Sequence, residues 1–234
     1  MADGAGPTGQ APDPKAALSW AFQEFRSHAT AYAGLAAVVT VIQFLQQLAA
    51  QPLLVTLQNC LDVSTPGQRN ACDDSLAGSL PASLGTLVLV LLAVVATAGV
   101  QRAALGGTRH VIPSGRQILA MHDLPRYVLY SLVYGIVVGL GLLLCLLPGL
   151  AAYVVLQLGF YSVLDRGTGV AASVRLSARF TMSNLGPAVT VAAVNLAALL
   201  LGGLFYGIPT LVTLPFACLF TAHMYRQYVQ EPVW

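Results

Sequence analysis

Charged side chains are scarce in this 234-residue sequence, which has 11 lysines and arginines and nine aspartates and glutamates. A soluble globular chain carries about 25% charged residues, so the 9% found here are too few to cover an ordinary water-exposed surface. Intrinsic disorder is excluded too, because it combines high charge with low hydrophobicity, and 56% of these residues are hydrophobic. The net charge of +2 does not indicate a nucleic-acid partner. The mean hydropathy of +0.73 instead indicates a membrane protein.

Sequence patterns for catalysis, metal binding and nucleotide binding are also missing. The four histidines, at positions 28, 110, 122 and 223, show no metal-ligand spacing. Gly106-Gly107-Thr108 lacks the lysine of a phosphate-binding loop, and no GxSxG motif occurs. His122-Asp123 is the one candidate acid–base pair, and a helix cap explains it better. We therefore expect a protein that is not an enzyme, with no catalytic residues, no metal and no cofactor.

Four long intervals contain no charged residue: Ser27–Leu61, Ser75–Gln101, Tyr127–Leu164 and Phe180–Tyr225. A helix needs about 20 residues to cross the hydrocarbon core, so the first two intervals fit one span each and the last two fit two each. Breaks at Leu147-Pro148-Gly149 and at Tyr206-Gly207-Ile208-Pro209 support this division. We predict six transmembrane helices over 31–50, 84–104, 127–147, 149–165, 187–207 and 209–228. Four spans with two re-entrant loops are the alternative.

An amphipathic helix on the inner membrane surface is expected before each pair of spans. In the first unit Asp13-Pro14 is a good helix start, and Leu18 and Phe22 follow at helical spacing. This segment is alternatively an extension of the first span. A shift of 61 residues superposes the later hairpins, placing Gly141 on Gly202 and Pro148 on Pro209. The fold class is thus all-α, with three hairpins in one domain over residues 15–230, between a disordered tail (1–14) and a C-terminal tail (231–234).

The basic residues predict the orientation in the membrane. Ten of the 11 fall on one side of the six-span arrangement, and Arg69 is the exception. Because lysine and arginine concentrate in cytoplasmic loops, both termini are predicted to be cytoplasmic. The outer loop, residues 51–83, contains Asp62, Asp73 and Asp74 and also Cys60 and Cys72. On an oxidising face these two cysteines are expected to form a disulfide.

Amide side chains are the main polar groups within the predicted spans. Gln43, Gln47 and Gln51 recur every fourth residue and so share one helix face, while Gln157 and Asn195 lie in the fourth and fifth spans. Such amides form interhelical hydrogen bonds worth about 0.6–2 kcal/mol each. One interpretation is polar contact between helices of this chain. The other is a polar face that binds a partner subunit or a lipid headgroup.

The stretch from Leu147-Pro148-Gly149 through Asp165-Arg166-Gly167 to Ser177 resembles the YciC-like and glycerophosphodiester-phosphodiesterase membrane-domain group. In that group a Leu-Pro-Gly turn leads into a span, an acidic-glycine turn and an amphipathic helix. The similarity covers residues 110–230 and implies a six-span bacterial membrane protein. The chain contains no phosphodiesterase catalytic domain, so that activity is not implied. It also looks like the LucB-like accessory subunits of Mce-type lipid importers.

Together these observations predict a non-catalytic accessory subunit in the bacterial cytoplasmic membrane. It would bind and stabilise a larger assembly, of the Mce lipid-transport type, with other integral membrane subunits such as a transporter permease, and lipids, as partners. The absence of charged residues within the spans argues against ion-coupled transport. An autonomous transporter of lipids or small molecules is the alternative hypothesis.

Overall fold

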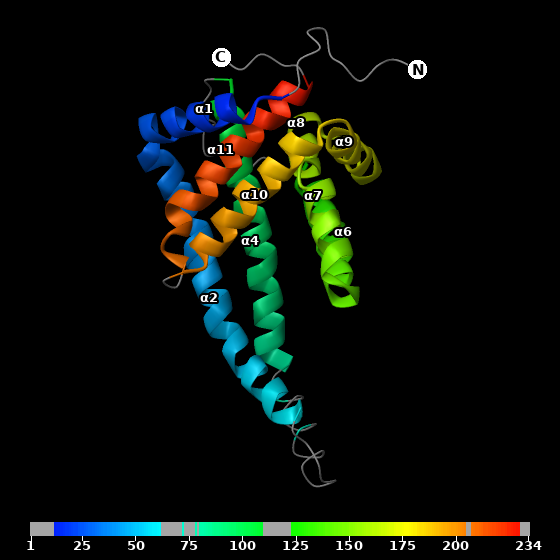
Figure 1. The fold of residues 1–234 in the computed structure, drawn as a ribbon. Helices are drawn as coiled ribbons and strands as arrows, with labels where there is room; N and C mark the ends of the chain where they lie inside the picture. Colours follow the sequence, from blue (N-terminus) through cyan, green and yellow to red (C-terminus); the bar gives the residue numbers. More distant parts are fainter. Residues whose placement is uncertain are drawn as a thin grey trace.

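The computed structural model describes residues 12–61, 72, 78, 80–109, 123–204 and 207–229, and every regular element in these ranges is an α-helix (Figure 1). The helices are α1 (Pro14–Ser27), α2 (Ala29–Leu61), α4 (Leu80–Gly107), α6 (Leu124–Leu144), α7 (Leu146–Leu156), α8 (Gly159–Arg166), α9 (Val170–Ser183), α10 (Leu185–Gly202) and α11 (Thr210–Val229). Five segments are long and apolar enough to cross a membrane: Ala29–Thr56, Ser83–Gly107, Leu124–Leu144, Leu146–Arg166 and Leu185–Gly202. The predicted all-α class is confirmed, and these segments are those of a multi-pass membrane protein.

Helix α1 begins at the predicted residue. The Asp13 carboxylate accepts a hydrogen bond from the Lys15 backbone N–H at 2.9 Å, and Pro14 occupies the first helical position. The helix ends before His28 and lies across the end of α2, so it is a separate helix and not an extension of the span (Figure 1). Ala17 and Ala21 are fully buried, and α1 packs mainly on α11. The predicted apolar residues Leu18 and Phe22 point away from the protein and stay exposed.

Helix α11 differs from the sixth predicted span. It has the predicted position in the sequence, but it is not among the five candidate spans. Every residue from Ala217 to Arg226 is buried, because α11 packs against α1, α2, α4 and α10. Threonine, histidine, arginine and glutamine residues make α11 less apolar than the other long helices. It forms the centre of the helix bundle and has no broad lipid-facing side.

The predicted break at Leu147-Pro148-Gly149 and the predicted outer loop 51–83 differ from the structure. Helix α6 stops at Cys145, whose backbone is extended, so Pro148 falls in the first turn of α7, where its missing N–H costs little. Helix α2 continues to Leu61 and α4 begins at Leu80, so both ends of the predicted outer loop 51–83 are helical. Several predictions lie outside the described residues: the tails up to residue 11 and from 230, the second surface helix before Asp123, and Arg69 with its neighbouring aspartates.

The 61-residue repeat corresponds to similar packing in the two later helix pairs. A Cβ atom on Gly141 would lie 2.7 Å from the Gly149 Cα, so α6 and α7 approach closely there. A Cβ atom on Gly202 would lie 2.8 Å from the Thr210 hydroxyl, where α10 meets α11. The same shift that carries Gly141 onto Gly202 also carries Gly149 onto Thr210. Leu124 and Leu185, which the shift also superposes, each begin a helix.

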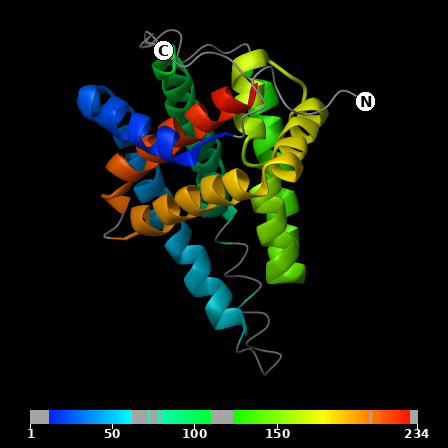
Figure 2. The ribbon, with the colours of Figure 1, turned by 45° about the horizontal axis from the view of Figure 1, so that its top comes forward.

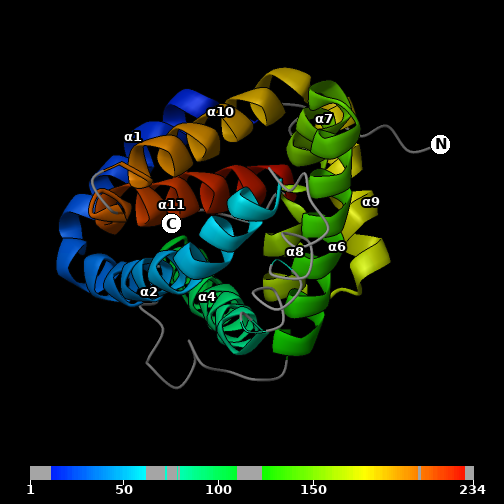
Figure 3. The same ribbon diagram turned by 90° about the horizontal axis from the view of Figure 1, so that it is seen from below.

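Helices α2 and α4 form one long pair, and α6 with α7 forms a second pair apart from it (Figure 1). Helix α10 runs obliquely between the two pairs (Figure 2), and α11 lies beside it. Seen from the far end of the molecule, α10 and α11 run along one side of the bundle, from α1 and α2 toward α7 (Figure 3).

Candidate functional site

A cavity of about 630 Å³ lies where these helix pairs meet. Its walls come from seven helices: α2, α4, α6, α7, α8, α10 and α11. Every described residue that lines it is uncharged, and amide, phenol and hydroxyl groups alternate with apolar side chains. A volume of this size is typical of small-molecule sites, which are mostly apolar with a few placed polar groups.

Four of the five predicted site residues line this one cavity. Gln43 and Gln47 come from α2, Gln157 directly follows the last residue of α7, and Asn195 comes from α10. The structure thus brings together amides that are up to 152 positions apart in the sequence. Gln51, one turn beyond Gln47 on α2, is exposed and does not belong to the lining.

One wall of the cavity is a closed hydrogen-bond network. The Asn195 side-chain N–H donates to Thr221 Oγ1 at 3.1 Å and to Gln157 Oε1 at 3.4 Å. The Gln157 amide donates to the backbone carbonyl of Ala188 at 2.9 Å, and the Thr221 hydroxyl donates to the carbonyl of Ala217 at 2.8 Å. These contacts join α7, α10 and α11, so here the polar-contact interpretation of the amides is correct.

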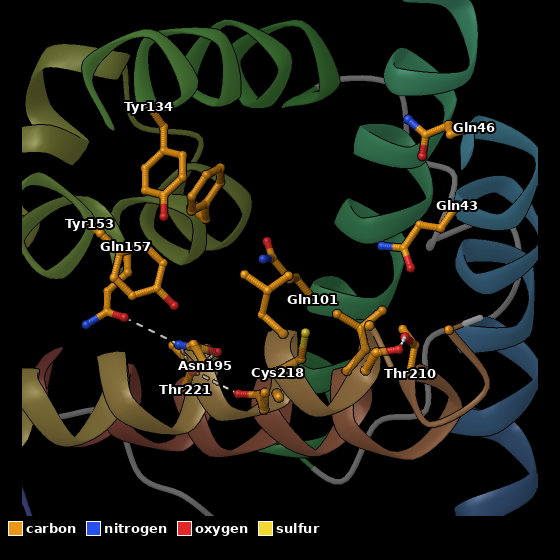
Figure 4. A pocket seen from close by; sticks show the side chains of 18 of the residues that line it. Gln43, Gln46, Gln101, Tyr134, Tyr153, Gln157, Asn195, Thr210, Cys218 and Thr221 are labelled. Carbon is orange, nitrogen blue, oxygen red and sulfur yellow. Dashed lines mark hydrogen bonds between the residues drawn. The ribbon is translucent and has the colours of Figure 1, made fainter. Parts of the chain in front are cut away.

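The facing walls have free polar groups. Gln43 and Gln46 lie across the cavity from Tyr134 and Tyr153 (Figure 4). Within the described parts of the chain, none of these four side chains forms a hydrogen bond with another residue. An unpaired amide or phenol in a membrane interior gains stability from any hydrogen-bonding partner that enters. This side of the cavity therefore has the chemistry of a binding surface.

The helix between Leu146 and Arg166 is broken at the cavity wall, and the break is held by side chains from other helices. Gln157 and Leu158 separate α7 from α8. Ser177 donates to the carbonyl of Val155 at 2.6 Å and accepts from the Leu158 N–H at 3.1 Å. The Tyr130 hydroxyl donates to the carbonyl of Leu156. Because backbone groups at membrane depth must be paired within the protein, these contacts allow a bend that aims Gln157 into the cavity.

Aromatic residues of the site were missed at the sequence level. Tyr134 on α6 and Tyr153 on α7 line the cavity, and Tyr134 packs edge-on against Phe160, with ring centroids 5.0 Å apart. The signal was present, because Tyr127, Tyr130 and Tyr134 recur at helical spacing in an interval without charge. Thr221 was missed because an isolated threonine in an apolar helix carries no signal of its own.

A buried charge cluster lies one turn along α8 from the cavity residue Tyr161. The Asp165 carboxylate is 2% exposed and is held by the fully buried Arg226 guanidinium through hydrogen bonds of 2.7 and 3.1 Å. Arg109 adds an ion pair of 3.1 Å, and Arg226 also donates to Thr108 Oγ1 at 3.2 Å. The cluster thus joins α8, α11 and the C-terminal end of α4.

The two cysteines of the outer loop, Cys60 and Cys72, form a disulfide, as predicted, with Cα atoms 5.6 Å apart. Of the other two, Cys218 is buried at the cavity, and Cys145 is exposed at the break before α7. In the described ranges no three histidine, cysteine or acidic residues gather as a metal-binding group.

Comparisons with known proteins give relatives without an assigned activity. The chain is 27% identical over 227 residues to an uncharacterized protein of Mycobacterium bovis and to uncharacterized proteins of two Mycobacterium tuberculosis strains. Each alignment covers 90% of this chain and 67% of the relative. No family model matches the chain. No solved structure matches it either.

Proposed function

We propose that this chain is a non-catalytic integral protein of the bacterial cytoplasmic membrane that holds a lipid or lipid-like molecule, as an accessory subunit of a larger lipid-transport assembly. The observation that carries this proposal is the uncharged cavity, with unpaired amides and phenols between membrane-type helices. An amphipathic ligand satisfies both parts of the lining, because its headgroup can pair with the amides and its chains can contact the apolar side chains.

The accessory role is supported by an apolar surface at the tip of the α6–α7 pair. Leu143 and Leu144 end α6 and are both 84% exposed, and Leu146 and Leu147 begin α7 with similar exposure. No polar side chain occurs between Leu142 and Leu150. A tip of this kind is not suited to water, so we propose that lipid tails or another membrane subunit cover it. An Mce-type permease is the kind of partner that the sequence resemblance implies.

The proposed orientation has both termini in the cytoplasm. Arg126 donates to the carbonyl of Gly167 at 2.7 Å, and Arg109 and Arg226 meet at Asp165, so these arginines gather at one end of the molecule. Cys60 and Cys72 lie at the far end of α2. A basic end and a disulfide-bonded end fit a cytoplasmic and an oxidising face, respectively. In the three-hairpin arrangement with six crossings both termini are cytoplasmic, and an even number of crossings keeps them so if one hairpin turns back within the membrane.

Affinity purification from native membranes in several mild detergents tests the accessory role. We expect defined membrane proteins to co-purify in constant ratio to this chain. A chain carrying Leu143→Ser and Leu147→Ser should lose them, while Leu18→Ser on the exposed side of α1 should retain them. Recovery of only an isolated monomer in every detergent would contradict the proposal.

An autonomous lipid or small-molecule transporter is the second candidate. It is favoured by the break between α7 and α8 at the cavity, because transporters build central sites from interrupted helices. Proteoliposomes that contain only the folded chain should then move a fluorescent lipid between leaflets faster than protein-free vesicles. Equal rates would remove this candidate.

A further inference from the structure

We infer that the cavity takes a lipid with an uncharged, hydrogen-bonding headgroup from the outer leaflet, because the α10–α11 hairpin turns back inside the membrane and the described lining of the cavity continues past its turn. This inference rests on the proposed lipid-holding function and names the class of ligand and the side from which it enters. Three observations carry it: the depth of the hairpin, the extent of the cavity, and the chemistry of the lining.

The turn between α10 and α11 lies about halfway through the membrane. A Cβ atom built on Gly207, in this turn, would lie 4.0 Å from Cγ2 of Thr40 on α2. Helix α2 starts at Ala29 at the basic end, and a rise of 1.5 Å per residue places Thr40 about 17 Å along it. The hydrocarbon core is about 30 Å thick. Figure 1 shows α2 and α4 continuing well beyond the α10–α11 pair.

Helix α11 returns from this turn to the basic end without crossing. Arg226 in its last turn reaches Asp165 and Thr108, next to the C-terminal end of α4. Leu219, in the middle of α11, already lies beside Gly107, the last residue of α4, with 3.5 Å between Leu219 Cδ2 and a Cβ built on this glycine. Helix α11 is therefore strongly inclined and close to the basic end, which agrees with its burial and its lower hydropathy.

The cavity extends past the turn of this hairpin. Its lining includes Ala50 on α2, about 32 Å from Ala29 at 1.5 Å per residue, and Thr86 near the start of α4. The α10–α11 pair covers the end of the cavity that is nearer the basic end of the molecule. The Asp165–Arg226 cluster lies between this pair and the basic end. The lining residues past the turn are Ala50 on α2 and Thr86 on α4, while Tyr134 on α6 and Tyr153 on α7 line the cavity near the level of the turn. The described lining of the cavity thus extends into the outer half of the membrane.

The lining selects against a charged headgroup. An anionic phosphate transferred from the interface into this cavity would lose hydration and meet no lysine or arginine among the described lining residues. Hydroxyl, ester or amide groups of a neutral headgroup can pair with Gln43, Gln46 and Tyr153 at no such cost. Diacylglycerol and glycosyl diacylglycerol have this chemistry, and phosphatidylglycerol does not.

Cysteine accessibility tests the depth of the hairpin. In a background with Cys145→Ala and Cys218→Ala, we would introduce Ile208→Cys at the hairpin turn or Gly78→Cys in the outer loop. A membrane-impermeant maleimide added to intact spheroplasts should label Gly78→Cys and leave Ile208→Cys unlabelled, and inverted vesicles should also leave Ile208→Cys unlabelled. A nitroxide at position 208 should show the high oxygen accessibility of the hydrocarbon core. Labelling of Ile208→Cys from outside would overturn the inference.

Photolabelling of the whole chain in nanodiscs tests the ligand class. The probe is diacylglycerol with a diazirine on one acyl chain, compared with phosphatidylglycerol carrying the same group. Diacylglycerol should label cavity peptides, and Gln43→Leu with Gln47→Leu should lower this labelling about tenfold, as expected for two lost hydrogen bonds. Tyr134→Phe, which keeps the ring, should lower it less. Gln51→Leu, on the same helix but outside the cavity, is the matched control and should not change it.

The outcomes separate this inference from the proposed function. Equal labelling of the cavity by both lipids, or equal effects of the Gln43/Gln47 and Gln51 variants, would overturn the inferred ligand class. If partner subunits still co-purify in that case, the accessory role stands without it. Specific diacylglycerol labelling of a chain that has no partners would contradict the accessory role and leave the inference intact.

Discussion

Asp165 and Arg226 show how a few charged side chains can organise a molecule that has hardly any. Both groups are removed from water, and their two hydrogen bonds, together with Arg109 and Thr108, satisfy them. The ion pair connects α11 to α8 at the basic end of the molecule. It lies next to the end of the cavity that α10 and α11 cover. In the sequence Arg226 looks like a topological marker only, because nothing there indicates that it is buried opposite Asp165.

Replacing one member of this pair should be costly. Asp165→Ala leaves the buried Arg226 without its carboxylate, and we expect a loss of about 3–5 kcal/mol in the free energy of unfolding. The double variant Asp165→Leu and Arg226→Met should lose much less, because neither charge remains buried. Thermal unfolding in one detergent, followed by circular dichroism, measures both. Equal losses in the single and double variants would show that the pair matters for packing and not for charge.

The disulfide provides a second test at the scale of single residues. Protein isolated under oxidising conditions should show two free thiols after complete unfolding and maleimide labelling, from Cys145 and Cys218, and four after reduction. Intact mass spectrometry gives both counts. The appearance of four thiols without reductant would contradict an oxidising location for Cys60 and Cys72.

At the scale of elements, the break between α7 and α8 depends on residues outside both helices. Ser177 on α9 pairs with two backbone groups, the carbonyl of Val155 and the N–H of Leu158. Ser177→Ala leaves both without this partner in a buried place and should cost about 1–3 kcal/mol. Ser183→Ala at the exposed end of α9 is the matched control, because this hydroxyl donates within its own helix and accepts only from the adjacent Asn184 side chain, in an exposed hydrogen bond. A similar loss in both variants, measured by thermal unfolding, would show that the break does not need Ser177.

The elements differ in how far the sequence predicts them. Uninterrupted apolar intervals locate α2, α4, α6 and α10, and the Asp13-Pro14 pair predicts the start of α1, because both signals are local. Helix α11 has the length of a span, but its burial depends on contacts with four other helices that no local pattern reveals. The stop at Cys145 was missed because proline is tolerated in the first turn of a helix, so Pro148 marks the start of α7 and not the turn.

The same distinction applies to the site. The spacing of four residues predicts that Gln43, Gln47 and Gln51 share one face of a helix. It does not show where along α2 that face meets the cavity. The structure places Gln43 and Gln47 in the cavity and Gln51 outside it. Gln157 and Asn195 were recognised from their type, because amides are conspicuous in apolar helices, whereas their hydrogen bond depends on the packing of α7 against α10.

At the scale of the whole molecule, the uneven distribution of charge predicts a single orientation. Fusions of a fluorescent reporter that folds only in the cytoplasm should be bright at both the N-terminus and the C-terminus. A periplasm-active phosphatase inserted after Gly78 should be active, because the disulfide-bonded end lies outside. A reporter that is dark at one terminus only would contradict an even number of crossings, and dark reporters at both termini would contradict the predicted orientation.

The central claim is that the uncharged cavity holds a neutral lipid. Its most direct test is mass spectrometry of the lipid that stays with the purified full-length chain in mild detergent. We predict about one uncharged-headgroup lipid per chain in the wild type and in Gln51→Leu, and its loss in the Gln43→Leu, Gln47→Leu double variant. A wild-type chain without such a lipid, or one retained equally by all three proteins, would contradict the account.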